Sequence, residues 1–548
     1  IRKQGGDLFK TSGFSPSRGY VEADEGAIPY ILQGSNLLSP GVMDADPGIE
    51  PGDEVLVIDR NGKVIGAGSA RKRGSDMIGT RGPAVKMRWA SDPEDDIPKT
   101  ELKRSGGDWQ GIWERVVEIN KPHLDAKAGR SISFIRNLIR EREIPYAVSF
   151  SGGKDSLATL LLVMEAGYRP PLLFVDTGIE FPETVSYVHE TADRYELELI
   201  EERPVSGFFE NLPRFGPPGR DFRWCCKSSK LGPMTRIING RFPGGVLTFI
   251  GQRRYESSGR KEKGSVWKNP WVPMQTGASP VQNWTALEVW LYIFRSGAPY
   301  NGLYEQGFNR IGCWLCPSTD MAERELIGRT AVDPAEWDSA LEKERKRRNL
   351  PDEWIRYGFH RFKRLPPSME KMASDMDLDL RHRIESGGED TMEDPIILVE
   401  GSRSCKTGLN QEGRISENIP WTRFGNLLNI IGEVTSVQEV EGIEIVPPGW
   451  SAKLPALEVY RDGALILRGI DERDLDSRRK ALVSVSLRST GCIGCGVCVG
   501  RCPIGALSID TASKTVMIDG GICIHCGSCL GPCPAEDFRD DPFQAHPT

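Results

Sequence analysis

Apolar runs of strand length alternate with longer amphipathic stretches through the middle of the chain. Residues 146–150 form one such run, and a second at 171–178 ends in a turn. Segments with helical spacing of their apolar residues follow both runs, and further apolar runs occur at 196–200 and 245–251. Strands that alternate with helices predict an α/β fold. We expect a doubly wound parallel sheet, whose ligands lie at the carboxyl ends of the strands.

The regions on either side have other patterns. Residues 1–95 contain short β-type runs separated by turn residues, which predicts a small β-barrel-like domain. Two helices are expected at 109–120 and 126–143, ahead of the first strand of the sheet. Charge-rich helices follow the sheet at 330–365. Residues 396–485 mix β-type runs with an apolar helix, so we expect a small α/β region there without an assigned function.

Composition narrows the classes of protein. The net charge of −7 argues against a protein that is basic overall, but it leaves room for a local basic face that binds nucleic acid. No run approaches the ~18 apolar residues of a membrane span, and residues 1–30 lack the pattern of a signal peptide. We therefore expect a cytoplasmic protein with no membrane partner, and the sequence leaves a homodimer open.

The turn after the first strand, Ser149–Ser156, has the properties of an anion site. Gly152 and Gly153 let the backbone bend and approach a ligand, and Asp155 and Ser156 stand where a helix begins. Unpaired N–H groups and the helix dipole converge at such a turn, so it attracts phosphate groups. The spacing differs from a Walker A loop, because no Gly-x4-Gly-Lys-Ser/Thr is present.

Thirteen cysteines carry most of the chemical information, and eight of them form two consecutive runs. Each run has the spacing Cys-x2-Cys-x2-Cys-x3-Cys-Pro. This is the pattern of bacterial two-cluster ferredoxins, in which the fourth Cys of one run ligates the cluster of the other, so the segment is expected to carry electrons. The predicted ligand sets are Cys492, Cys495, Cys498 and Cys533 for one 4Fe–4S cluster, and Cys502, Cys523, Cys526 and Cys529 for the second.

The SGGKDS loop at 151–156 resembles the loop of the N-type ATP pyrophosphatase and PAPS reductase superfamily. Further motifs similar to those of the PAPS reductase family follow in order, among them VDTG at 175–178 and IGC at 311–313, and the resemblance covers about residues 145–320. It implies an adenine nucleotide substrate: PAPS, APS or ATP. The residues implied for nucleotide binding are Ser149, Ser151, Gly152, Gly153, Lys154, Asp155, Ser156, Asp176, Thr177 and Gly178.

Three arginines belong to the same ordered set of motifs. Arg253, Arg254 and Arg260 follow the fourth expected strand. Guanidinium groups bind the oxygens of phosphate or sulfate bidentately, so we expect these arginines to hold the reacting end of the nucleotide during catalysis. Ordinary surface arginines on a loop are the alternative interpretation.

The first domain resembles a known RNA-binding fold. The segment PGVMDADPGIEPGDEVLVID at 40–59 is similar to the PUA domain, an RNA-binding pseudobarrel, and the resemblance covers roughly residues 14–90. It implies RNA as a partner. A spacer or interaction module remains an equal alternative, because the cluster of Lys and Arg in this region is modest.

A third set of four cysteines consists of the adjacent pair Cys225 and Cys226 and the pair Cys313 and Cys316. Adjacent cysteines with a distant Cys-x2-Cys resemble the cluster site of the APS reductase branch. The resemblance implies a third 4Fe–4S cluster beside the nucleotide. A structural zinc site built from the same four thiolates is the alternative, because the number of thiolates alone does not choose the metal.

One cysteine, Cys405, belongs to none of these sets. Sulfonucleotide reductases attack the activated sulfate with a cysteine in a C-terminal Glu-Cys-Gly-x-His motif, and that motif is absent here. Cys405 lies between Arg403 and Lys406, and neighbouring cations lower the pKa of a thiol, so we expect it to be the nucleophile. An inert loop cysteine is the alternative.

Two enzymatic functions and one non-enzymatic function fit these features. We favour a PAPS reductase-family redox enzyme of sulfur metabolism, which reduces PAPS or APS with electrons from a donor such as a ferredoxin, relayed by three 4Fe–4S clusters. The second is an ATP-dependent RNA (tRNA) thiolation enzyme, because the intact SGGKDS loop is closer to the ATP-using members. The third is a non-catalytic iron–sulfur electron carrier. The expected domains are PUA-like at 1–95, PAPS reductase-like at 108–365, a linker with a small α/β region at 366–485 and a two-cluster ferredoxin-like domain at 486–540.

Overall fold

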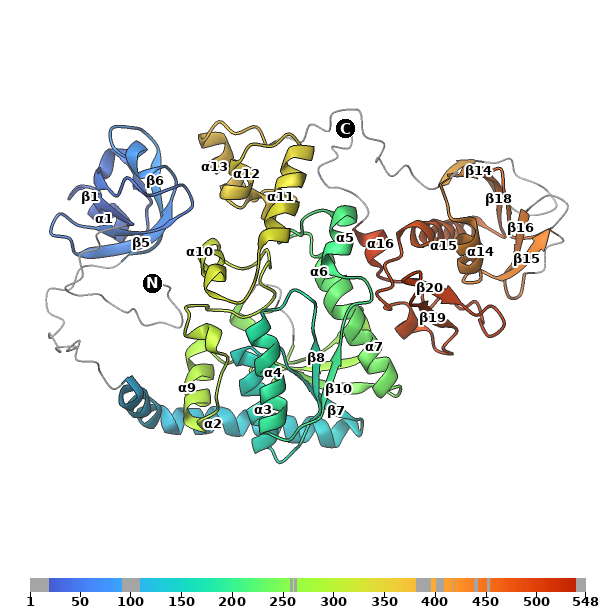
Figure 1. The fold of residues 1–548 in the computed structure, drawn as a ribbon, viewed down its shortest axis with the longest axis horizontal. Coiled ribbons are helices and arrows are strands. Elements are labelled where there is room, and N and C mark those ends of the chain that lie inside the picture. Colours follow the sequence, from blue (N-terminus) through green and yellow to red (C-terminus); the bar gives the residue numbers. More distant parts are fainter. Residues whose placement is uncertain are drawn as a thin grey trace.

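The structure, a computed structural model, has three folded parts (Figure 1). Figure 1 shows a β domain in blue, a central α/β domain from cyan to yellow, and a C-terminal domain in orange and red beside the central one. No helix among the described residues combines the length and apolar character needed to cross a membrane. The described residues are 19–90, 109–256, 260, 264–380, 396–400, 409–416, 418–437, 442–450 and 454–538.

The first part is a six-stranded sheet with the strand order β2-β6-β5-β4-β1-β3. Neighbouring strands are antiparallel except for β1 and β4, which are parallel. Alternate residues such as Val21, Val57 and Ile65 are fully buried in its core, which confirms the expected β-barrel-like domain. Its elements are β1 (Tyr20–Ala23), α1 (Ile28–Leu32), β2 (Leu37–Leu38), β3 (Val42–Ala45), β4 (Glu54–Ile58), β5 (Val64–Ala70) and β6 (Pro83–Ala90).

The central sheet has the order β11-β12-β10-β7-β8-β9 and is parallel except for β11 at its edge. Helices α2, α3, α4 and α9 pack on one face and α7 packs on the other, so the predicted doubly wound sheet is confirmed. The strands are β7 (Tyr146–Ser149), β8 (Leu172–Val175), β9 (Leu199–Glu202), β10 (Val246–Ile250), β11 (Val266–Asn269) and β12 (Val272–Ala278). The helices are α2 (Trp109–Arg142), α3 (Lys154–Glu165), α4 (Pro182–Arg194), α7 (Gly232–Arg241) and α9 (Ala286–Ser296).

Strand β9 begins later than the apolar pattern predicts. It starts at Leu199, whereas the pattern starts at Glu196. Glu196 has a φ of 51°, and the N–H of Leu197 donates to the carbonyl of Ala192 at 2.9 Å. This left-handed end of α4 is normally made by glycine, so the sequence contains no signal for it.

A single helix, α2, replaces the two helices expected at 109–120 and 126–143. Pro122 lies inside it, and an interior proline costs a helix roughly 3 kcal/mol. Contacts directly after the proline hold the helix together. His123 Nε2 lies 2.6 Å from Glu288 Oε1, Lys127 Nζ lies 3.2 Å from Glu288 Oε2, and Leu124 is fully buried. Packing against α9 therefore keeps the helix continuous past Pro122, although a proline normally ends a helix.

A lobe of short helices lies beyond the carboxyl ends of the central strands. Its core is aromatic: Trp224 stacks on Phe208 and Phe215, with ring centroids 5.2 and 5.0 Å apart. Glu50 of the β domain accepts hydrogen bonds from Arg356 (3.1 Å) and from the Tyr357 hydroxyl (2.9 Å), which joins that domain to the lobe. The helices are α5 (Phe208–Phe215), α6 (Trp224–Cys226), α10 (Met321–Glu325), α11 (Ala335–Arg347), α12 (Glu353–Arg356) and α13 (Pro367–Asp375).

The C-terminal part combines an antiparallel sheet, of order β13-β14-β18-β17-β16-β15, with the cysteine-rich segment. One hydrophobic core contains residues of both, and Leu482 and Val485 of α15 belong to it. The boundary expected between 485 and 486 therefore falls inside a helix. The elements are β13 (Ile396–Glu400), β14 (Leu409–Ile415), α14 (Trp421–Leu428), β15 (Glu433–Val437), β16 (Gly442–Val446), β17 (Leu457–Tyr460), β18 (Ala464–Gly469), α15 (Glu472–Gly491), β19 (Leu507–Asp510), β20 (Thr515–Ile518) and α16 (Pro534–Asp537).

Candidate active site

The turn between β7 and α3 has the geometry of an anion site. Gly152 has a φ of 71°, which favours glycine, and a Cβ atom there would stand 2.8 Å from Thr184 Cγ2. Ser156 closes the turn, because its hydroxyl accepts from Ser151 N (3.3 Å) and donates to Gly153 O (2.8 Å). Gly153 is the N-cap of α3 and supplies no side-chain cap, which suits a helix N-terminus that binds an anion.

Lys154 and Tyr304 meet over this turn. The backbone N–H of Lys154 donates to the Tyr304 hydroxyl at 2.8 Å, and Lys154 Nζ donates to the carbonyl of Asn309 at 3.3 Å. Burial raises the pKa of Tyr304, which keeps its hydroxyl neutral. Sequence reasoning assigned no role to Tyr304, although it belongs to the ordered motifs. Only the folded structure shows that Tyr304 contacts the turn between β7 and α3.

Arg253 lies behind the same turn. It is buried, and its Nε donates to Asp155 Oδ1 at 2.5 Å. Gly251, at the end of β10, allows this approach, because a Cβ atom there would overlap the backbone of Asp155. The ion pair fixes the end of β10 against the first turn of α3. Arg253 therefore contacts the turn predicted to bind the nucleotide, but through a protein carboxylate.

The other two predicted arginines also bond side chains of the protein. Arg254 Nη1 donates to Asn283 Oδ1 at 3.1 Å, and Arg260 forms an ion pair with Glu256. Glu256 also lies 3.9 Å from Arg253 Nη2, so its carboxylate connects Arg253 with Arg260, whereas Arg254 bonds a different side chain. Their role in holding an oxyanion stays a prediction.

The end of β8 carries Asp176, Thr177 and Gly178. Asp176 Oδ1 accepts from Gly178 N (3.0 Å), and its Oδ2 pairs with Arg203 Nη2 (2.6 Å). Thr177 is buried, and its Oγ1 lies 3.8 Å from Cys313 Sγ. This strand end therefore connects the nucleotide-binding edge of the sheet with the third set of cysteines.

The structure brings together the four cysteines of that set. Cys225 and Cys226 lie on α6, and Cys313 and Cys316 lie in the turn that precedes α10. Arg223 Nη2 contacts Cys226 Sγ at 3.3 Å and Cys316 Sγ at 3.9 Å, so one guanidinium bridges the two pairs. The sequence contained the adjacent Phe222-Arg223-Trp224, but nothing in the spacing indicated this contact.

Charged groups surround the four thiols. Cys313 Sγ donates to Glu180 Oε1 at 3.4 Å, and burial raises the pKa of Cys313. Burial lowers the pKa of Lys230, but the negative charges of Glu180, Cys313 and Cys226 outweigh it, so the net shift is upward. Cations beside four thiolates suit an anionic 4Fe–4S site and an anionic zinc site alike. Among the residues described, no group of three or more His, Cys, Asp or Glu side chains has the arrangement that holds a single metal ion.

The eight cysteines of the two ferredoxin-like runs separate into two pockets. Each pocket contains three cysteines of one run and the fourth cysteine of the other, which is the division that the spacing predicts. The thiolate set and the mainly apolar walls fit a 4Fe–4S cluster in each pocket. Cys492, Cys495, Cys498 and Cys533 line the first pocket, and Cys502, Cys523, Cys526 and Cys529 line the second.

The first of these pockets lies against the central domain. Arg236 of α7 donates from Nη1 to the carbonyl of Cys495 at 3.2 Å. Ile493, which lines the pocket, also packs into the aromatic core that contains Cys225 and Cys226. The first pocket is therefore the neighbour of the third cysteine set.

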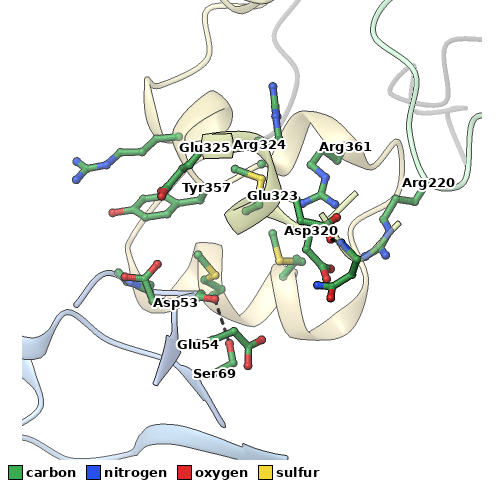
Figure 2. Close-up of a pocket in the computed structure, with 18 of the residues that line it drawn as sticks. Asp53, Glu54, Ser69, Arg220, Asp320, Glu323, Arg324, Glu325, Tyr357 and Arg361 are labelled. Carbon is green, nitrogen blue, oxygen red and sulfur yellow. Dashed lines mark hydrogen bonds between the residues drawn. The ribbon is translucent and has the colours of Figure 1, made fainter. Parts of the chain in front are cut away.

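A cavity of about 2020 Å³ lies between the β domain and the lobe of α10 to α13. Figure 2 shows Asp53, Glu54 and Ser69 of the β domain facing side chains of the lobe across it. Trp314 and Leu315, which lie between Cys313 and Cys316, line the cavity. Asn309, whose carbonyl accepts from Lys154, lines it too. The cavity therefore extends from the β domain to residues that adjoin the Lys154 turn and the third cysteine set. Other charged residues along it are Asp46, Arg71, Arg88, Arg220, Asp320, Glu323, Arg324, Glu325, Asp338, Arg356 and Arg361.

Cys405 lies outside the described residues, so its role as a nucleophile stays a prediction.

Three segments of the chain match known domain families. Residues 145–319 match the phosphoadenosine phosphosulfate reductase domain, residues 19–88 the PUA domain and residues 491–536 the 4Fe-4S dicluster domain. An uncharacterized protein of Methanocaldococcus jannaschii is 35% identical over 331 residues, which are 60% of this chain and 68% of that protein. An adenosine 5'-phosphosulfate reductase of Geobacillus kaustophilus is 30% identical over 216 residues, 38% of this chain and 88% of the reductase.

Among solved structures, the phosphoadenylyl-sulfate reductase of Candida auris is 21% identical, with a TM-score of 0.28 over 35% of this chain and 95% of that one. The domain matches occur in the order that the sequence motifs predict, and the bacterial reductase is matched over most of its length. The chain belongs to the phosphoadenosine phosphosulfate reductase family, with a PUA domain before the family domain and a 4Fe-4S dicluster domain after it.

Proposed function

We propose that this chain reduces an adenylylated sulfate, PAPS or APS, with electrons relayed through 4Fe–4S clusters. One observation supports this function above the others. The first dicluster pocket packs through Ile493 against the aromatic core of the third cysteine set, and that set lies 3.8 Å from the buried strand end at Thr177. A route for electrons thus ends beside the nucleotide-binding edge of the sheet. An enzyme that only transfers a group has no use for such a route.

Different residues of the central domain have different roles in binding the nucleotide. The N-terminus of α3 and Lys154 receive the phosphates of the nucleotide, and Arg253 holds Asp155 and the turn in place. Arg254 and Arg260 follow the carboxyl end of β10. A small movement of their side chains away from Asn283 and Glu256 frees them to bind sulfate oxygens. Asp176 shapes the turn after β8 through its bond to Gly178 N.

The chemistry requires two electrons for each sulfur. The bond between sulfur and the bridging oxygen of the phosphate breaks, AMP or PAP leaves, and the sulfur passes from the oxidation state of sulfate to that of sulfite. The 4Fe–4S clusters, when bound, supply these electrons one at a time. The thiolates of Cys225, Cys226, Cys313 and Cys316 would hold the third cluster, and Arg223 and Lys230 would offset its negative charge.

The direct test is anaerobic incubation of the purified protein with APS, PAPS or ATP and a chemical reductant. We expect sulfite with AMP from APS, or with PAP from PAPS, and no pyrophosphate from ATP alone. Pyrophosphate release from ATP without any sulfite from APS or PAPS contradicts the reductase function.

The metal content is expected to be about twelve iron and twelve sulfide per chain, because three sets of four cysteines each hold a 4Fe–4S cluster. Iron and sulfide analysis of anaerobically purified protein measures this. In the matched variant Cys316→Ser, the iron content is expected to fall to about eight while the dicluster signal in electron paramagnetic resonance remains. About eight iron with one zinc in the unmutated protein would assign zinc to the third set.

Replacing Gly153 by valine is expected to abolish nucleotide binding. A Cβ atom at this N-cap would already stand 3.5 Å from Tyr304 Oη and 3.7 Å from Ser151 Oγ, so the two methyl groups of valine occupy the space of a phosphate. Calorimetry with the accepted nucleotide measures the loss. Gly129→Ala on α2 is the control, because a Cβ atom there has no neighbour within 4 Å. Unchanged affinity in Gly153→Val would remove the turn from the site.

A second function has one observation in its favour. The large cavity extends from the PUA domain to the Cys313–Cys316 turn and to Asn309, whose carbonyl contacts Lys154, which suits an RNA held at one end and modified at the other. In this function ATP adenylates a base carbonyl with release of pyrophosphate, and a sulfur nucleophile then displaces AMP. Incubation with RNA, ATP and labelled sulfide tests it: label in RNA supports thiolation, and its absence with sulfite formed from APS or PAPS excludes it.

A further inference from the structure

The two dicluster pockets differ in their surroundings. The first is enclosed: Val497 beside it is buried, and the central domain covers it through Arg236 and Ile493. The second has Cys526 among its lining residues, and Cys526 is exposed to solvent. The carbonyl of Asn429, at the end of α14, covers one side of this pocket through His525 Nδ1 at 2.5 Å. On the other side, Cys526 is exposed to solvent within the described part of the chain.

An apolar rim surrounds the open side of the second pocket. Three exposed isoleucines define it: Ile504 (41% exposed) and Ile524 (55%) line the pocket, and Ile522 (50%) directly precedes Cys523 in the chain. Residues 503–505 and 520–528 contain no Lys, Arg, Asp or Glu. About half of each isoleucine side chain faces solvent, so these side chains contribute only in part to packing the domain. A ring of apolar side chains without charges indicates a contact surface for another protein.

We propose that the Ile504–Ile522–Ile524 rim is the docking surface for a small one-electron carrier protein, and that electrons arrive through the Cys502, Cys523, Cys526 and Cys529 pocket. The partner is a protein that exposes its own redox group at an apolar face, of the flavin or iron–sulfur class. Two points argue for this occupant. The rim surrounds a predicted cluster ligand that is open to solvent, and electron transfer requires the two redox groups to approach closely. The patch is also small, as expected of transient redox encounters and not of permanent subunit interfaces.

The direction of flow follows from the enclosure of the first pocket. One electron leaves the reduced carrier, which is oxidised, and reaches the cluster held by the open pocket, which is reduced. The electron then passes to the enclosed pocket, which adjoins the Cys225–Cys226 helix. Two such transfers match the two electrons that sulfate consumes on conversion to sulfite. This direction rests on the proposed function, whereas the docking surface does not.

Stopped-flow mixing with photoreduced flavodoxin tests the surface, because flavin absorbance reports oxidation of the probe. Ile524→Asp places a charge at the most exposed position of the rim, and we expect the rate of flavin oxidation at low protein concentration to fall about tenfold. Ile470→Asp is the control, because Ile470 is 68% exposed elsewhere in the same domain, and its rate should be unchanged. Reduction by dithionite, which needs no protein docking, should proceed at the same rate in all three proteins.

A second rim variant separates docking from damage to the pocket. Ile522→Asp, two residues further from Cys526 in the chain, should repeat the loss with flavodoxin while its iron content equals that of the unmutated protein. The proposal is wrong if both rim variants keep the flavodoxin rate, if Ile470→Asp loses as much, or if flavodoxin does not reduce the unmutated protein. An equal loss with dithionite at full iron content also contradicts it. No nucleotide is present, so failure of the reductase function would leave each of these outcomes unchanged.

Discussion

Replacing Arg488 by methionine is expected to destabilise the cluster-binding domain by about 3 kcal/mol and to release its iron, because removing one member of a buried pair leaves the other uncompensated. The Arg488 side chain is 6% exposed and pairs with Glu536 at 2.5 Å. Its two terminal nitrogens donate to the carbonyls of Cys529 and Gly531, both at 2.9 Å. One guanidinium thus joins α15 to the second cysteine run and to α16. Urea denaturation followed by cluster absorbance measures the change.

The same helix supplies the control. Arg479 pairs with Asp476 at 2.5 Å, but 48% of its side chain is exposed, and an exposed pair contributes only about 0–1 kcal/mol. Arg479→Met should therefore leave both the urea midpoint and the iron content close to their original values. Equal denaturation curves for the Arg488 and Arg479 variants would show that α15 is held to the cysteine runs by its apolar contacts alone.

Local signals predicted the phosphate turn and the division of the ferredoxin-like cysteines. A strand, two glycines and a helix start lie within eleven residues at 146–156, so neighbours in the sequence define the turn. The Cys-x2-Cys-x2-Cys spacing works in the same way, because ligands on one short turn must converge. Even the exchange of Cys502 and Cys533 between pockets followed from the repeat of the motif.

Contacts between residues far apart in the sequence could not be predicted from the sequence. Arg253 was expected to bind an oxyanion, but Asp155, 98 positions away, takes its Nε. Nothing in the order of residues shows that Gly251 lets the two elements approach. The continuation of α2 through Pro122 also depends on tertiary contacts, since Glu288 of α9 bonds side chains on its next turn. The packing of whole helices determines such pairings, and the local helix propensity of the residues does not predict them.

The cavity beside the PUA domain also could not be predicted from the sequence. Motifs identified the domain, but its distance from the active site was unknown until Glu50 was seen to bond Arg356 and Tyr357. That contact places the β domain over the lobe and creates the space that Trp314 and Asn309 line. An N-terminal module separated from the core by a linker gives no such information from its sequence. The position of this cavity raises a functional question, namely whether the sulfur that leaves the site goes to solvent or to RNA.

Cys405→Ser is expected to abolish turnover with PAPS or APS and to leave nucleotide affinity and iron content unchanged. In the proposed reaction the Cys405 thiolate attacks the sulfur, a bond forms between the two sulfurs, and AMP or PAP leaves with the bridging oxygen. Two electrons then cleave the new bond, release sulfite and restore the thiolate. Single turnover of the unmutated protein with sulfur-labelled substrate, without reductant, should leave label on the peptide that contains Cys405. Ser404→Ala, next in the chain, is the control and should keep both activity and label. Full activity in Cys405→Ser would show that no covalent step uses this residue, and label found on RNA instead would move the assignment to thiolation.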